Sequence, residues 1–128
     1  MDSSRSESPT FSLEDILRSG DYVTLKSVIT KNINVSENII IDCAKGIEKA
    51  RYHKMEIYGS ILFNRFKCWR IVLENINREI SENELESIIF VVNSMYKDIN
   101  WNHAFWKQIS CNPNLNQYAK NWIKSRTQ

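Results

Sequence analysis

Apolar residues recur at intervals of three and four along most of this chain, which is the period of an amphipathic α-helix. The clearest case covers residues 54–75, where two adjacent apolar stripes alternate with polar positions. So wide an apolar band predicts a helix that packs against neighbours on two sides. The same period predicts further helices at residues 13–19, 21–31, 37–51, 82–97, 101–110 and 114–125.

Residues that begin or end helices stand where this pattern changes. Gly20 follows the first predicted helix, Asp21 is suited to cap the second, and Pro113 breaks the chain before the last. Ser81 and Glu84 form the sequence signature of a capping box, in which each side chain accepts a hydrogen bond from the backbone N–H of the other. These signals place the predicted helix ends.

The run Ile-Ile-Phe-Val-Val at residues 88–92 allows two interpretations. It is apolar all round, which predicts a central helix, but its β-branched residues also suit a buried strand. The capping box before it and the high Glu content of the segment favour the helix.

Three glycines and two prolines are too few for a many-stranded sandwich or barrel, and 128 residues amount to one domain. We therefore predict an all-α protein of six or seven helices stacked as helical hairpins. Residues 1–10 are rich in serine and end at a proline, which predicts a short disordered tail ahead of a single domain at 11–128.

Two features suggest that the helices form a repeated array. An Asn-x-Asn turn follows three of the predicted helices, at residues 32–34, 75–77 and 112–116. Helix pairs that recur in this way are typical of helical-repeat proteins. The alternative is an irregular bundle, because an Asn-rich chain also produces such turns by chance.

Within residues 11–36 the chain resembles an ankyrin repeat. The family's Thr-Pro-Leu-His opening is absent, and the later units lack its turn glycine. The resemblance implies a stacked-hairpin binding module and carries no catalytic residues over. A plain bundle of six or seven helices accounts for the same positions. The residues that match the family's helix and turn positions are Leu13, Ile16, Leu17, Gly20, Asp21, Leu25, Lys26, Val28, Ile29 and Val35.

Charge and cysteine content narrow the class of protein. The formal net charge of +2 is far below that of a dedicated nucleic-acid binder. Three widely spaced cysteines without a C-x-x-C pair predict reduced thiols in an intracellular protein, cytoplasmic or nuclear. The start of the chain has no apolar signal segment, and no apolar run is long enough to span a bilayer, so we expect neither secretion nor a membrane partner.

The sequence offers little support for catalysis. His53 and His103 show no metal-binding spacing, and the three glycines are too isolated to form a phosphate loop. Cys43 or Cys111 could meet a histidine in space, but without a local signature. We therefore predict no catalytic residues, no metal site and no cofactor, and expect a protein that is not an enzyme.

The last two predicted helices carry more aromatic surface than two short helices need. Aromatic side chains that reach solvent are frequent anchors of protein interfaces. Our first hypothesis is therefore a protein-interaction module that docks a partner of unknown identity in a groove between helix pairs. The predicted anchors are Trp101, Phe105, Trp106 and Trp122.

Residues 45–70 support an alternative hypothesis. This segment holds seven Lys or Arg residues against two Glu, interleaved with aromatics, a combination that can hold phosphates while rings stack on bases. It would make the protein a nucleic-acid-binding regulator, unless the aromatics belong to the core and the charges to the solvated face. The candidate residues are Lys49, Arg51, Tyr52, Lys54, Arg65, Lys67 and Arg70.

Overall fold

Seven α-helices make up the regular structure in the residues that the computed structural model describes, which are 13–29, 35–52 and 59–127. This confirms the all-α class, and residues 88–92 are helical. The proposed tail at 1–10 lies outside the described residues, as do 30–34 and 53–58. The helices are α2 (Leu13–Ser19), α3 (Tyr22–Val28), α4 (Glu37–Tyr52), α5 (Gly59–Asn75), α6 (Glu82–Met95), α7 (Ile99–Ile109) and α8 (Gln117–Thr127).

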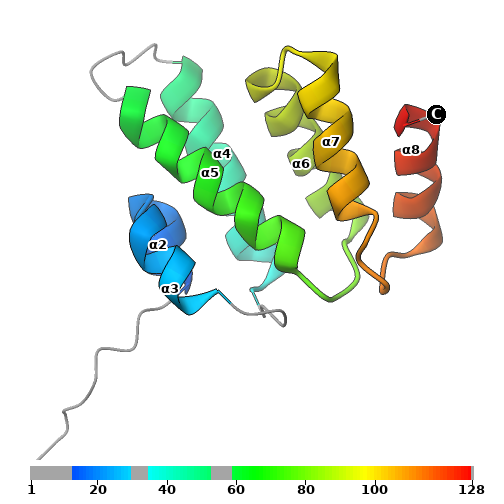
Figure 1. The fold of residues 1–128 in the computed structure, drawn as a ribbon, viewed down its shortest axis with the longest axis horizontal. Coiled ribbons are helices and arrows are strands. Elements are labelled where there is room, and N and C mark those ends of the chain that lie inside the picture. The colour runs from blue at the N-terminus through cyan, green and yellow to red at the C-terminus, as the bar shows by residue number, and fades with distance from the viewer. Residues whose placement is uncertain (1–12, 30–34, 53–58, 128) are drawn as a thin grey trace, which may run out of the picture.

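The helices stack in two layers (Figure 1). Helices α4 and α6 lie side by side in one layer, and α5 and α7 lie side by side in the other. The short hairpin of α2 and α3 packs on α4 and α5 at one end, and α8 closes the other end against α6 and α7. This arrangement fits stacked hairpins, while the internal repeat stays a prediction.

The core fills the space between the layers. Trp69 on α5 is fully buried, and its indole N–H donates a hydrogen bond to the Ile40 carbonyl of α4 at 3.1 Å. Trp106 on α7 is also fully buried and packs edge-on against Trp122 of α8. Large aromatic side chains thus join α5 to α4 and α7 to α8, because each removes a wide apolar surface from water.

Gly20 joins α2 to α3 in a conformation that other residues rarely adopt. Its φ is +73°, in the left-handed region, and a Cβ there would approach the backbone nitrogen of Arg65 to 3.1 Å. The glycine therefore allows both the turn and the close contact with α5. Leu25 of α3 is buried as predicted, but Val28 is exposed, and α3 ends at Val28 rather than at residue 31.

Two helix starts differ from the predictions. Asp98 begins α7 earlier than expected, because its carboxylate accepts hydrogen bonds from the N–H groups of Asn100 and Trp101. Helix α8 begins later, since the side-chain oxygen of Asn116 accepts from the Ala119 N–H. The capping box of Ser81 and Glu84 is present as predicted.

The loops on one edge of the molecule are bonded to each other. Arg78, in the loop before α6, donates to the Val35 carbonyl just before α4. Asn112 and Asn116, in the loop before α8, donate to the carbonyls of Arg78 and Ile80. The loop before α6 is thereby held from both sides. Asn114 adds a bond to Asn77.

Candidate functional site

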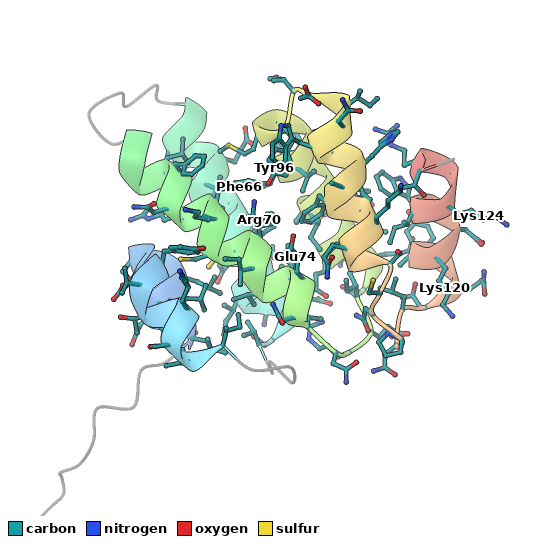
Figure 2. All side chains as sticks on the ribbon, viewed as in Figure 1. Phe66, Arg70, Glu74, Tyr96, Lys120 and Lys124 are labelled. Atoms are coloured by element: carbon teal, nitrogen blue, oxygen red, sulfur yellow. The ribbon has the colours of Figure 1, made fainter. Side chains whose placement is uncertain are left out.

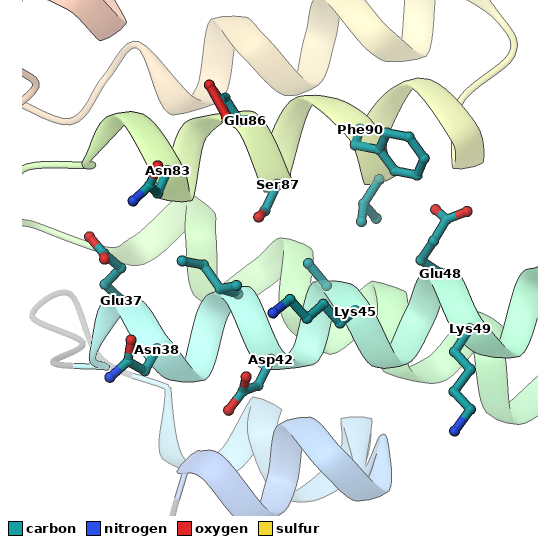
Figure 3. Close-up of a pocket in the computed structure, with 13 residues that line it drawn as sticks. Glu37, Asn38, Asp42, Lys45, Glu48, Lys49, Asn83, Glu86, Ser87 and Phe90 are labelled. Atoms are coloured by element: carbon teal, nitrogen blue, oxygen red, sulfur yellow. The ribbon is translucent and has the colours of Figure 1, made fainter.

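An open groove of about 940 Å³ runs between α4 and α6 (Figure 3). Its walls are helical on both sides. Apolar, acidic, basic and amide side chains all contribute to it, so it offers both an apolar contact surface and charges. The lining residues are Glu37, Asn38, Ile41, Asp42, Ala44, Lys45, Glu48, Lys49, Asn83, Glu86, Ser87, Phe90 and Val91.

The groove is hollow because small side chains stand where the two helices approach. Ala44 on α4 is buried, and Ser87 on α6 points toward α4. Neither side chain fills the space between the helices, while their larger neighbours Ile40 and Ile88 turn inward to the core. A furrow with an apolar floor follows from this pattern.

Phe90 is the main exposed apolar residue of the groove. Its side chain keeps 57% of its surface exposed, although it lies in the middle of the apolar run at 88–92. The helix was predicted to be central, but its Phe90 faces outward, where none of the described elements packs over that face of α6. An exposed phenyl ring next to a furrow provides a surface for an apolar ligand group.

Carboxylates outnumber lysines around the groove by four to two. None of these carboxylates forms an ion pair with a side chain that the structure describes. One oxygen of Glu48, Oε2, is buried and has no hydrogen-bond partner. A buried carboxylate oxygen without a partner is costly, so a positive charge brought next to this carboxylate would be stabilising.

The charges are not evenly placed along the groove. Figure 3 shows Glu37 at one end, near Asn83, and Glu48 at the other, pointing toward the part of α6 that carries Phe90. Lys45 lies between these two carboxylates, while Asp42 and Lys49 point away from α6. Glu86, on α6, points away from α4. Glu37 and Glu48 are therefore the carboxylates at the two ends of the groove, with the ammonium of Lys45 between them.

The structure separates the four aromatic residues predicted as partner anchors. Trp101 is 63% exposed and stacks on Tyr96 with ring centroids 6.4 Å apart. Phe105 and Trp106, also predicted as anchors, are buried in the core, so their rings are not exposed for a partner in this structure. Trp122 is half-buried between Trp106 and the guanidinium of Arg126. Only Trp101 offers a largely free ring.

The predicted basic surface does not form one patch among the described side chains. Lys49 lines the α4–α6 groove, whereas Lys67 lies over the ring of Tyr22, 4.1 Å from its centroid. Arg65 lies beside Gly20. The side chains of the other three candidates, Arg51, Tyr52 and Lys54, lie outside the described part of the structure.

Arg70 points in yet another direction, into the space between α5 and α7 (Figure 2). It donates to the hydroxyl of Tyr96 at 2.8 Å and lies 3.8 Å from the Glu74 carboxylate. Burial alone would lower the pKa of Arg70, but the Tyr96 hydrogen bond and the Glu74 charge raise it above its ordinary value. This arginine has a structural role.

The pKa values of the two buried thiols are raised rather than lowered. Burial raises the pKa of Cys43 and raises that of Cys68 to about 11, whereas a nucleophilic cysteine needs a lowered pKa. No cluster of histidine, cysteine and acidic side chains in the described residues could hold a metal ion. Cys111 is exposed and is not part of a disulfide.

The sequence analysis missed the groove, although one signal pointed to it. Positions 83, 87, 90 and 94 share one face of α6 and read Asn, Ser, Phe and Ser. A single phenylalanine in an otherwise polar stripe predicts an exposed aromatic side chain. The buried oxygen of Glu48 has no comparable signature, because it depends on how α4 and α6 pack.

Comparison with known proteins gives no relative of this chain: no family model, no curated protein and no solved structure matches it. Among the described residues, none of the helices combines the length and apolar character needed to cross a membrane.

Proposed function

We propose that this protein is an interaction module that docks an amphipathic helix of a partner protein in the α4–α6 groove. The observation that carries the proposal is the exposed Phe90 beside an open, apolar-floored furrow between two helices. A helix laid in such a groove buries its apolar stripe against the floor while its polar side stays in water. The proposal keeps the predicted role in protein binding and takes Phe90 as the anchor in place of the predicted Trp101, Phe105, Trp106 and Trp122.

The shape of the groove supports a helix as the ligand. Residues 37–49 of α4 line one wall, so the wall is about 18 Å long at a rise of 1.5 Å per residue. A partner helix of three to four turns matches that length. Both walls are regular helices with paired backbone groups, so an added strand would find no free edge to bond in this groove.

A phage-displayed library of helical peptides, randomised on one face, tests the proposal. We expect peptides that bind the wild-type protein and lose binding to the Phe90→Ser variant, which restores the polar stripe of α6. Trp101→Ser is the matched control, because it removes an exposed aromatic ring from α7 and should leave the same peptides bound. Circular dichroism checks that both variants keep their helical content.

Two results would overturn the proposal. One is a selection in which no peptide depends on Phe90, or in which the enriched peptides depend on Trp101 instead. The other is binding of single-stranded RNA at low salt by a protein that enriches no peptide, which would favour the nucleic-acid alternative. In that alternative, the exposed ring of Phe63 would stack on a base and the Lys67 ammonium, 5.7 Å from the ring, would contact a phosphate.

A further inference from the structure

The charges of the α4–α6 groove point to the chemistry of its ligand. We infer that the partner helix carries a cationic residue at each end of its apolar stripe, separated by three turns. This inference rests on the proposed function, because it assigns a partner class to the same groove. It is carried by the two acidic ends and by the unpartnered oxygen of Glu48.

Each acidic end offers a carboxylate to an incoming cation. At one end, Glu48 points toward α6 and its Oε2 atom has no hydrogen-bond donor, so a lysine or arginine of the partner beside this carboxylate would balance a charge that the described side chains leave unpaired. At the other end, Glu37 faces the groove near Asn83. Arg78 and Glu37 attract each other electrostatically, but both terminal nitrogens of Arg78 donate hydrogen bonds to Glu84. Glu37 therefore forms no ion pair with Arg78.

The distance between the ends sets the spacing of the cations. Glu37 and Glu48 are eleven positions apart in one helix, which corresponds to about 16 Å. A partner helix aligned with α4 spans the same distance between residues i and i+11, which also fall on one face. Residues i+4 and i+7 of that face would lie over the floor and be apolar.

Lys45 adds specificity between the two ends. It lies in the middle of the groove, where it would repel a cation at the centre of the partner's stripe. A helix that is basic along its whole length is therefore a poorer ligand than one with cations only at its ends. This distinguishes the proposed ligand from a generally basic segment, which would bind by net charge alone.

Three synthetic 18-residue helical peptides test the inference by fluorescence anisotropy. They share one leucine stripe and carry Lys, Gln or Glu at positions i and i+11. We expect the Lys peptide to bind about tenfold more tightly than the Gln peptide, and the Glu peptide to bind most weakly. The preference should shrink as salt is raised, since exposed charges are screened.

Variants of the protein assign each cation to its end. Glu48→Gln should remove the preference for Lys at one end only, and Glu37→Gln at the other. Glu79→Gln is the matched control, because it removes an exposed carboxylate outside the groove and should change nothing.

Equal binding of Lys and Gln peptides, still dependent on Phe90, would overturn the inference and leave the proposed function intact. Loss of binding by all three peptides would overturn both.

A second copy of the chain is the competing source of cations. Lys120 and Lys124 on α8 point away from the body of the molecule (Figure 2). Sedimentation of the protein alone at high concentration separates the cases. We expect a single species with the mass of the monomer. Self-association that the double substitution Lys120→Glu and Lys124→Glu abolishes would assign the groove to a second copy and overturn the inference.

Discussion

The buried carboxylate of Glu84 shows how one residue holds several parts of this fold. It is fully buried, and both of its oxygens accept hydrogen bonds from Arg78, at 2.8 and 2.6 Å. One of them also caps the N–H of Ser81. The ion pair raises the pKa of Arg78, chiefly through the Glu84 hydrogen bonds. Such a buried pair is costly to break because the remaining charge is left without a partner.

We expect Arg78→Ala to lower the free energy of unfolding by about 3 kcal/mol, since it leaves the Glu84 charge buried and removes the bond to Val35. Arg78→Lys should restore only part of this, because an ammonium cannot bind both oxygens in parallel. Urea denaturation followed by circular dichroism measures the change.

Arg18→Ala is the control: it breaks an exposed ion pair with Glu14 and should lower the free energy of unfolding by less than about 1 kcal/mol. Equal effects at the two arginines would contradict this account.

The two tryptophans of α7 differ in burial: Trp106 is buried and Trp101 is exposed. We expect Trp106→Ala to cost about 3 to 5 kcal/mol by leaving a large cavity, and Trp101→Ala to change stability by less than about 0.5 kcal/mol. Trp106→Phe should cost much less than the alanine substitution, because the indole N–H of Trp106 has no hydrogen-bond partner to lose. Urea unfolding of the three variants measures these differences. A destabilised Trp101→Ala variant would contradict the exposure of its ring.

The thiols should differ in reactivity for the same reason. Burial raises the pKa of Cys43 and takes that of Cys68 to about 11, so both are almost fully protonated at pH 8. We expect iodoacetamide to label Cys111 alone in the native protein and all three cysteines in urea, as read by peptide mass spectrometry. Rapid labelling of Cys68 in the native state would show that α5 opens locally.

Among the elements, the loop before α8 is bonded through alternate asparagines to the loop before α6 and to the start of α8. Asn116 donates to the Ile80 carbonyl and also accepts from the Ala119 N–H at the start of α8. Asn112 and Asn114 donate to the same neighbouring loop. These residues therefore join the end of the helical stack to its centre, which gives the asparagines of the turn at residues 112–116 a packing role.

We expect Asn116→Ala to destabilise the protein by about 1 to 2 kcal/mol, because it removes both a helix cap and a bond to Ile80. Asn116→Asp keeps an oxygen for the cap but places a carboxylate against the Ile80 carbonyl, so it should restore stability only in part. Hydrogen exchange of the α8 amides is the direct measurement. If exchange rises equally in every helix, the substitution acts on the whole fold rather than on α8.

The elements also show what a sequence alone predicts. The capping box at Ser81 and the turn at Gly20 were predictable because each depends on residues within a few positions. Periodicity placed helices at residues 37–51 and 82–97, close to the observed α4 and α6, but did not single out Phe90 as the outward residue of α6. It could not tell Trp101 from Phe105, which share one stripe of α7, because exposure depends on where neighbouring helices end. The groove was unpredictable for the same reason: it belongs to the packing of α4 against α6.

At the scale of the whole molecule, the stacking order predicts how the protein opens. Among the described helices, α4 and α5 contact neighbours on both sides, whereas α8 packs mainly on α6 and α7, and α3 mainly on α2 and α5. In a stacked array each helix is stabilised mainly by its neighbours, so the ends should open at lower free energy than the centre. The loop bonds of Asn116 should keep α8 from opening as readily as α3.

We therefore expect native-state hydrogen exchange in low denaturant to protect α4 and α5 most, α8 less and α3 least. One common free energy of opening for all helices would show instead that the chain unfolds as a single cooperative unit.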